Sequence, residues 1–313
     1  MPQHVRVGTR GSALALIQTG HVVDALAAAG DLTLETVRVR TDGDRLTGSL
    51  ASLGGTGVFV TALRDALLDG RCDLAVHSFK DLPTGDAAGL LIGAVPARED
   101  SRDALCARDG RTLADLPAGA RVGTGSPRRR ALLLAARPDL DVVDIRGNVD
   151  TRLRRITDDL DAVVLARAGL ARLGRLDAVT DAFAPDVMLP APGQGALAIE
   201  VRGDEPADSP LAHALHALDH RPTRLAVLAE RALLARLEAG CAAPIGALAQ
   251  LSGSALRLDA VVARPDGTAT LRRGAQRELT ADADADAVRL GSDLADELLG
   301  LGAADLAELG VRP

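Results

Sequence analysis

The chain has no tryptophan, no tyrosine and a single lysine among its 313 residues, and it has only three phenylalanines and three cysteines. Scarce aromatic rings and a formal net charge of −7 both speak against a nucleic-acid-binding protein, which needs stacking side chains and positive charge. The cysteines Cys72, Cys106 and Cys241 are odd in number and lie far apart, without a Cys-x-x-Cys pair. This arrangement argues against a disulfide framework and against a zinc site, so we expect reduced thiols.

Long apolar runs are also missing. No stretch approaches the roughly 20 apolar residues of a membrane span, and MPQHVRVGTR at the N-terminus lacks the charged-then-apolar layout of a secretory signal. Hydrophobic residues nevertheless make up 47% of the chain, which is enough for a large core divided among two or three domains. We therefore expect a globular cytoplasmic protein that does not contact a membrane.

The basic residues are unevenly distributed. Lys80, in the segment VHSFKD, is the single lysine among 36 basic residues. A compact ammonium cannot be replaced by a planar guanidinium, so we predict a chemical role for Lys80, with chance survival as the alternative. Residues 121–175 contain twelve arginines but only seven aspartates. This local excess of positive charge predicts that the segment binds an anion.

Short segments rich in β-branched residues alternate with helical ones as far as residue 166. The strand segments are VRVGT (5–9), LETVRVR (34–40), LAVHS (74–78), RVGT (121–124), DVVDIR (141–146) and AVVLA (162–166). The helical segments cover residues 13–30 and 59–70 and begin again at Pro127 and Asn148. This βαβ order predicts mostly parallel sheets that bind ligands at the carboxyl ends of their strands.

Two helix starts resemble each other. VGTRGS (7–12) follows the first strand, and VGTGSP (122–127) follows a strand in the second series. Ser126 can cap its helix and Pro127 can be its first residue, so free backbone amides should point to where anions bind. The repeat predicts two similar α/β domains facing one cleft, although ordinary helix capping would also explain either copy.

The last third of the chain has a different pattern. Helices are expected over residues 211–218 and 223–237, followed by strands around a Pro-Asp-Gly turn and a final helix from about Asp284. Strands in series followed by a helix predict a small α+β domain. ADADADA (281–287) is interpreted as a solvated helix start, and we expect no metal site there.

Ten segments, taken in their order along the chain, carry information that the periodicity of the sequence does not. They are TRGSALAL, DGD, GGTGVFV, DLAVHSFKDLP, REDSRDAL, VGTGSPRRR, IRGNVDTRL, ARAGLARLG, LPAPGQGALAIE and LEAGCAAPIG. With them the chain resembles the porphobilinogen deaminase family, also called hydroxymethylbilane synthases, along nearly its whole length. VHSFKD, RGNVDTRL and the Gly-Cys loop before Pro-Ile-Gly are the most specific of these segments.

The resemblance implies two α/β domains like those of periplasmic binding proteins, arranged around a cleft, and a small C-terminal α+β domain. The implied domains are residues 1–96 with 197–214 (domain 1, active-site loop 41–57), residues 101–192 (domain 2, inserted in domain 1) and residues 218–313 (domain 3). It also implies a transferase of tetrapyrrole and haem biosynthesis. Such an enzyme condenses four porphobilinogen molecules head to tail, with loss of ammonia, on a covalent dipyrromethane primer and releases hydroxymethylbilane by hydrolysis.

The resemblance also gives Cys241 a role. From its surroundings alone, a buried structural cysteine is the favoured interpretation. In the family, the matching cysteine carries the dipyrromethane cofactor through a thioether, which suits a thiolate that traps a soft carbon electrophile. The resemblance therefore implies that Cys241 in domain 3 anchors the cofactor and stays attached through turnover.

Catalysis is assigned to Asp81 in the same way. Loss of ammonia from the substrate leaves a positive charge on the pyrrole nitrogen, which a nearby carboxylate would stabilise. Without the resemblance, the alternative is that Asp81 is a helix-start or turn residue before Leu82-Pro83.

The remaining implied contacts are to anions, because each pyrrole ring carries an acetate and a propionate that guanidinium groups and helix amides can bind. The cofactor-binding residues implied besides Cys241 are Ser78, Lys80, Asp81, Thr124, Ser126, Arg128, Arg129 and Arg146. The substrate-binding residues implied are Arg10, Ser12, Phe59, Arg152, Arg172 and Gln194. Arg130, Arg154 and Arg155 are left as structural or surface residues.

The chain departs from the family in its active-site loop. Many members have lysine in Gly-Gly-Lys-Gly where this chain has Thr56, and lysine is also absent around Ser52. Anion contacts from this loop are therefore in doubt. Stacking on pyrrole rings depends mainly on Phe59, since Phe79 and Phe183 are the only other aromatic residues.

Two other functions stay open at this point. A non-catalytic, anion-binding protein of the periplasmic-binding type would explain two α/β domains, and covalent pyrrole on the chain would exclude it. A nucleic-acid binder would use SPRRR (126–130), which a gel shift would test. We expect a monomer acting on the small molecule porphobilinogen, and whether the product passes to uroporphyrinogen-III synthase stays open.

Overall fold

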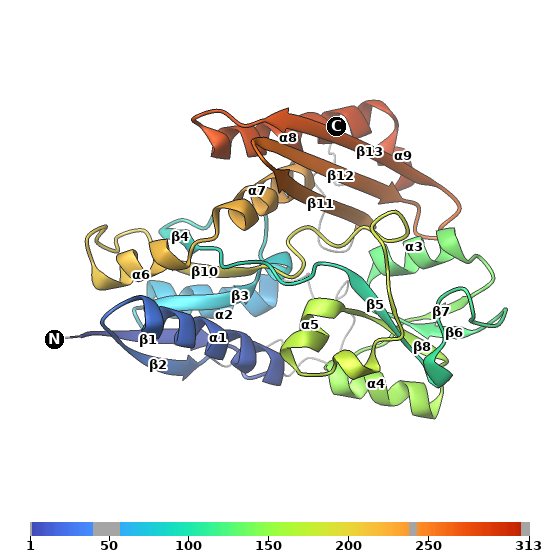
Figure 1. The fold of residues 1–313 in the computed structure, drawn as a ribbon, viewed down its shortest axis with the longest axis horizontal. Coiled ribbons are helices and arrows are strands. Elements are labelled where there is room, and N and C mark those ends of the chain that lie inside the picture. Colours follow the sequence, from blue (N-terminus) through green and yellow to red (C-terminus); the bar gives the residue numbers. More distant parts are fainter. Residues whose placement is uncertain (1, 40–56, 238–242, 308–313) are drawn as a thin grey trace. The chain divides into compact units, whose positions relative to one another are not determined.

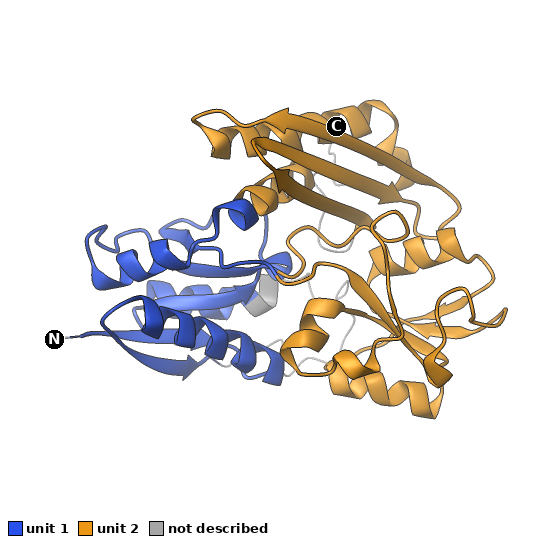
Figure 2. Ribbon diagram, viewed as in Figure 1, with its two compact units in different colours: residues 1–98, 196–224 blue, residues 99–195, 225–313 orange. Residues whose placement is uncertain are grey.

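A computed structural model describes residues 2–39, 57–237 and 243–307. Figure 2 colours two compact units, which are residues 1–98 with 196–224 and residues 99–195 with 225–313. The division into three domains that the resemblance implies differs from this one and stays a prediction.

The first unit is built on a five-stranded sheet with the order β2-β1-β3-β10-β4 (Figure 1). Its strands are β1 (Gln3–Thr9), β2 (Leu32–Arg38), β3 (Leu74–Ser78), β4 (Leu90–Ala94) and β10 (Leu197–Arg202). Its helices are α1 (Ala13–Ala29), α2 (Gly57–Leu68) and α6 (Pro210–Leu218). β1 runs parallel to β2 and β3, whereas β10 runs antiparallel to β3 and β4. The chain therefore leaves this sheet after β4 and returns to it with β10.

Local chemistry sets the start of α1. Ser12 is the N-cap, and its hydroxyl accepts a hydrogen bond from the N–H of Ala15 (3.3 Å). Val5 and Val7 are alternate residues of β1, so they lie on one face of the sheet. Both are fully buried in a cluster that includes Leu26 of α1. The helix therefore covers that face.

The second unit contains another five-stranded sheet, with the order β7-β6-β8-β5-β9. Its strands are β5 (Asp103–Ala107), β6 (Arg121–Gly123), β7 (Asp141–Val143), β8 (Ala162–Ala166) and β9 (Asp181–Ala182). The helices that connect or follow them are α3 (Pro127–Ala136), α4 (Val149–Asp158) and α5 (Arg167–Arg172). β6 is parallel to β7 and β8, and β5 is antiparallel to β8 and β9. The prediction of two similar α/β sheets is therefore confirmed.

One strand of this sheet is shorter than predicted. The segment DVVDIR was expected to form a strand as far as Arg146, but β7 ends at Val143. The chain has to turn before α4, and Gly147 makes the turn with a φ of 104° that other residues rarely adopt. Asn148 then caps α4 by accepting a hydrogen bond from the N–H of Thr151 (2.9 Å).

The C-terminal part of the second unit is an antiparallel three-stranded sheet with the order β11-β12-β13. Its elements are α7 (Arg221–Arg236, whose first residues belong to the first unit), β11 (Ile245–Ser252), β12 (Ala255–Ala263), β13 (Thr270–Glu278), α8 (Ala283–Gly300) and α9 (Ala303–Leu306). The predicted α+β pattern is confirmed here, with the turn between β12 and β13 containing Pro265, Asp266 and Gly267.

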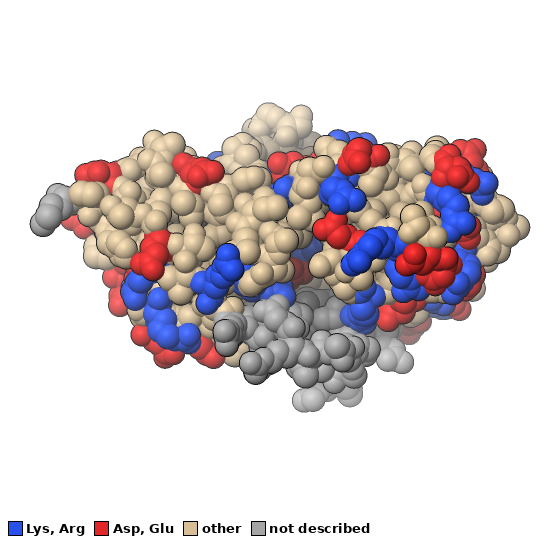
Figure 3. All heavy atoms as spheres, turned by 90° about the horizontal axis from the view of Figure 1, so that it is seen from below, with Lys and Arg blue, Asp and Glu red and all other residues tan. Residues whose placement is uncertain are grey.

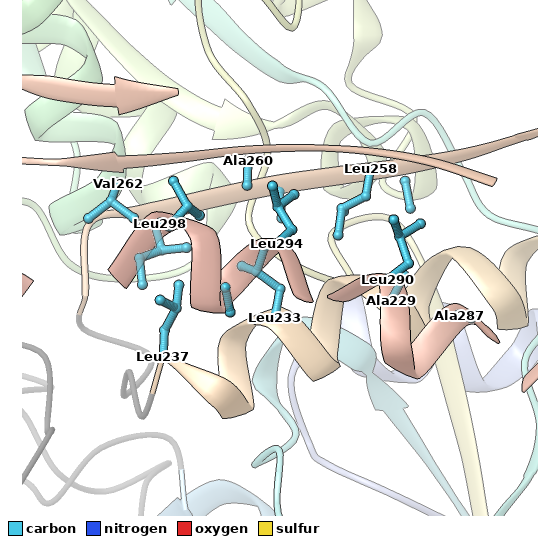
Figure 4. Close-up of a cluster of buried hydrophobic side chains, with 14 of the residues drawn as sticks. Ala229, Leu233, Leu237, Leu258, Ala260, Val262, Ala287, Leu290, Leu294 and Leu298 are labelled. Atoms are coloured by element: carbon cyan, nitrogen blue, oxygen red, sulfur yellow. The ribbon is translucent and has the colours of Figure 1, made fainter. Parts of the chain in front are cut away.

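Leucine side chains fill the space between this sheet and its helices. Figure 4 shows Leu233 of α7 with Leu290 and Leu294 of α8 beneath Leu258 of β12. At Gly291, an added Cβ would collide with the backbone carbonyl of α7, so the glycine allows the two helices to approach closely. The sheet and helices thus share one hydrophobic core.

The acidic start of α8 differs from the prediction in one respect. Asp282 caps the helix as a solvated start would, but Asp286 is only 3% exposed. Its carboxylate accepts hydrogen bonds from Thr280 and Arg289, and these bonds lower the pKa of Asp286 to about 2. The expectation of a wholly solvated segment was wrong because these partners satisfy a buried carboxylate.

In the ranges that the structure describes, none of the helices has the length and apolar character needed to cross a bilayer.

Candidate anion-binding site

A buried ion cluster surrounds Asp103 in the second unit. Its carboxylate is 0% exposed, and Oδ2 lies 2.8 Å from Nη1 of Arg128 while Oδ1 lies 2.8 Å from Nη2 of Arg129. The side-chain amide of Gln194 donates a further hydrogen bond to Oδ1 (2.8 Å). Burial alone would raise the pKa of Asp103, but the charges of both arginines and the hydrogen bonds lower it to about 2.

The backbone places this cluster at the carboxyl edge of the parallel strands. Asp103 begins β5 opposite Ala166, the last residue of β8. Arg128 and Arg129 lie in the first turn of α3, directly after β6. These residues therefore lie at strand ends, where the sequence analysis expected ligands to bind, and their binding of a ligand stays a prediction.

The start of α3 is tightly constrained. Ser126 caps the helix by accepting a hydrogen bond from the N–H of Arg129 (3.4 Å), and Pro127 is its first residue. The hydroxyl of Thr124 in turn accepts a hydrogen bond from the N–H of Ser126 (3.2 Å). A Cβ at Gly125 would lie 2.6 Å from the carbonyl oxygen of Ile145, so the loop packs directly on the following backbone.

Positive charge exceeds negative charge in this region. Two buried guanidinium groups share the single carboxylate of Asp103, and the Nε of Arg128 is buried with no hydrogen-bond partner among the described residues. Burial and the nearby charges of Arg129 and Arg146 lower the pKa of Arg152 to about 10. An anionic ligand would relieve both the repulsion and the unsatisfied donor.

Arg172 and Gln194 have a different environment from the one expected of substrate-binding residues. Arg172 donates a hydrogen bond from Nη2 to the carbonyl oxygen of Gly195 (2.7 Å), and burial lowers its pKa. Gln194 is 1% exposed and bonds to Asp103 and to the carbonyl oxygen of Ser101 (2.8 Å). Both residues thus hold the loop LPAPGQG in place, and their contacts with a substrate stay a prediction.

A second group of candidate residues lies in the first unit. β3 ends at Ser78 and continues into a 3₁₀ turn over Phe79–Asp81. Arg10 and Ser12 follow β1, which runs parallel to β3, so the two segments leave the sheet at the same edge. The turn buries Phe79 (4% exposed), whereas Lys80 and Asp81 are half-buried. The structure thus brings Arg10, Ser12, Ser78, Lys80 and Asp81 to one edge of one sheet.

A buried network behind this turn was not predicted from the sequence. Glu200 of β10 is 2% exposed, and Arg64 of α2 donates hydrogen bonds to it from Nε (3.0 and 3.2 Å). Nε2 of His77, the residue before Ser78, lies 3.3 Å from Oε2 of Glu200. These neighbours lower the pKa of Glu200 although burial would raise it. A charged residue in the otherwise apolar strand LAIEV was the only sequence signal.

Two of the three cysteines are sequestered. Cys72 and Cys106 are both 0% exposed. Burial raises the pKa of Cys72 to about 11 and that of Cys106 to about 12, so both remain protonated thiols at neutral pH. Cys241 and Thr56 lie outside the described residues, and the side chain of Phe59 at the start of α2 is likewise not described.

Known proteins match almost all of this chain. Residues 5–208 match the family model described as porphobilinogen deaminase, dipyromethane cofactor binding domain, and residues 224–300 match the one described as porphobilinogen deaminase, C-terminal domain. A porphobilinogen deaminase of Leifsonia xyli is 59% identical over 98% of this chain and 96% of its own length. One from Cutibacterium acnes is 57% identical over 97% of each.

Among solved structures, immunogenic lipoprotein A from Vibrio vulnificus is 14% identical over 70% of this chain and 96% of its own, with a TM-score of 0.42. A YaeC-family lipoprotein from Enterococcus faecalis is 12% identical over 71% of this chain and 93% of its own, with a TM-score of 0.41. Structural similarity at these TM-scores is too low to support a conclusion about this chain.

Proposed function

The chain belongs to the porphobilinogen deaminase family, and from this premise we propose that its two strand-edge groups have different roles in the reaction. The enzyme is a transferase that condenses four porphobilinogen molecules on a dipyrromethane cofactor and releases hydroxymethylbilane. In our proposal, the arginine cluster of the second unit holds carboxylates, and the turn at Asp81 in the first unit performs the chemistry.

The arginine cluster fits the dipyrromethane. When bound, the cofactor supplies the primer whose terminal pyrrole carbon attacks the incoming substrate. Its acetate and propionate groups would be held by Arg128, Arg129, Arg146 and Arg152, together with backbone amides at the start of α3. The observation that carries this assignment is that two buried guanidinium groups, those of Arg128 and Arg129, share the single carboxylate of Asp103. Burial, together with the charges of Arg129 and Arg146, also lowers the pKa of Arg152 to about 10.

We assign the covalent attachment to Cys241. A thioether requires a thiolate, and burial keeps Cys72 and Cys106 protonated and out of reach. This leaves Cys241, in the Gly-Cys segment that matches the family, as the remaining cysteine of the chain.

Asp81 is the residue that we propose as catalytic. It ends the 3₁₀ turn after β3, and the N–H of Phe79 in this turn bonds to the carbonyl oxygen of Ala196 in the neighbouring segment (3.0 Å). This bond ties the start of the turn to the segment before β10. The carboxylate of Asp81 would accept a hydrogen bond from the pyrrole N–H of the substrate. It would thereby stabilise the positive charge that develops on the pyrrole nitrogen as ammonia leaves. Lys80 would pair with a substrate or primer carboxylate.

Intact-protein mass tests the attachment. The purified chain should exceed its sequence mass by two linked pyrrole units, Cys241→Ser should lose this addition and most activity, and Cys106→Ala should keep it. An active wild-type enzyme whose mass equals the sequence mass would refute the assignment.

The structure gives little support to nucleic-acid binding. Two of the three arginines in SPRRR, Arg128 and Arg129, are buried and paired with Asp103. On the face in Figure 3, basic and acidic side chains are interspersed without one broad basic area. A monomeric, cytoplasmic enzyme remains our proposal.

A further inference from the structure

Asp103 pairs with Arg128 and Arg129, two of the four arginines that we propose to bind the cofactor, yet it was absent from the residues expected from the sequence. It lies at the start of β5, where pairing with β8 fixes its backbone. The N–H of Phe183 bonds to its carbonyl oxygen (3.0 Å) and Gln194 bonds to its carboxylate (2.8 Å). The carboxylate has no exposed surface.

The two arginines use their donors differently. Arg129 donates from Nε to Asp103 (2.9 Å), from Nη1 to the carbonyl oxygen of Val164 (3.1 Å) and from Nη2 to Gln194 (3.4 Å). Protein groups therefore occupy every nitrogen of this guanidinium. Arg129 acts mainly as a fixed positive charge.

Arg128 has one buried nitrogen, Nε, that makes no hydrogen bond among the described residues. Nη1 is shared between Asp103 (2.8 Å) and the carbonyl oxygen of Leu189 (2.6 Å), but Nε has no partner among the described residues. A guanidinium is planar and rigid, so holding Nη1 in place also sets the direction in which Nε points. Asp103 and the carbonyl oxygen of Leu189 thereby help to orient the unpartnered Nε of Arg128 toward an anion.

We propose that Asp103 is a positioning residue for the cofactor: its buried carboxylate suppresses the repulsion between Arg128 and Arg129 and orients Arg128 toward a cofactor carboxylate. This inference rests on the proposed role of the arginine cluster. Asp103 does not contact the reacting atoms. Its effect should therefore appear in cofactor loading and in KM before it appears in the rate of the bound substrate's conversion.

The test compares Asp103→Asn with a matched control. Asparagine keeps the shape but removes the charge, so we expect soluble protein that is incompletely loaded by intact mass, and a KM for porphobilinogen raised about tenfold or more. Asp286→Asn is the control, because Asp286 is also a buried carboxylate of the second unit that pairs with an arginine and has a pKa of about 2. This control should be fully loaded with an unchanged KM, even if its melting temperature falls.

A second variant covers the case in which Asp103→Asn does not fold. Asp103→Asn combined with Gln194→Glu exchanges the carboxylate and the amide, which keeps the charge of the cluster but removes the Asp103–Arg128 ion pair. It should fold and still load incompletely. Full loading with wild-type KM in either variant would overturn the proposal. A failure of the proposed function would give a different result, because the wild-type protein itself would then carry no pyrrole. That result would overturn both the proposed function and the role of Asp103.

Discussion

Alkylation of the native enzyme should find no reactive thiol, although the chain has three cysteines. The folded enzyme is treated with an excess of iodoacetamide at pH 8, and the number of labels bound to it is determined from its intact mass. A thiol with the ordinary pKa of 9.0 is then about one-tenth thiolate. Raising the pKa of Cys72 to about 11 and that of Cys106 to about 12 lowers the thiolate fraction by about 100-fold and 1000-fold.

Burial slows both reactions further, since neither thiol has exposed surface. Under the proposed attachment, the sulfur of Cys241 is in a thioether, so Cys241 should not react at all. Wild-type protein should therefore take up no label while folded and two labels after unfolding in guanidinium, and unfolded Cys106→Ala should take up one. Three labels after unfolding would show that the third thiol is free, and rapid native labelling of Cys72 or Cys106 would refute the argument from burial.

Two further predictions separate neighbouring residues of the turn after β3. Asp81→Asn keeps the size of the side chain but loses its charge, so it should retain the cofactor by mass while turnover falls about 10²- to 10⁴-fold in steady-state kinetics; a rate near that of wild type would contradict our mechanism. Lys80→Arg replaces a compact ammonium with a bulkier fork, so it should weaken cofactor loading or raise KM more than it lowers kcat. If this variant matches the wild type in both measurements, the single lysine is an accident of composition.

Features set by short-range chemistry could be predicted from the sequence. β3 covers LAVHS as expected, and α3 begins at Pro127 after its Ser126 cap. These elements depend on residues that are adjacent in the chain. The end of β7 was misjudged because Ile145 continues the apolar pattern beyond Asp144, whereas the strand ends at Val143, before the turn at Gly147.

The interior ion pairs could not be predicted in the same way. Asp103 and Arg129 are 26 residues apart, and Arg64 and Glu200 are 136 apart. From the sequence alone, each of these charged residues is expected at the solvated surface, because its partner becomes a neighbour only in the folded chain. Asp286 is a different case, because its partners Thr280 and Arg289 are only six and three residues away in the chain, yet its burial also escaped prediction. Roles in cofactor and substrate binding came from the resemblance to a family and remain predictions for each residue.

The position of β10 between β3 and β4 has a consequence for synthesis of the chain on the ribosome. Among the strands that the structure describes, β4 pairs only with β10 in this sheet, and β10 is translated after the whole of residues 99–195. β4 therefore emerges without a strand partner in this sheet, and β3 has one unpaired edge, until residues 197–202 leave the exit tunnel. During this interval the nascent chain carries open strand edges, which are sites of misassembly, while the elements of the inserted segment are already available to fold.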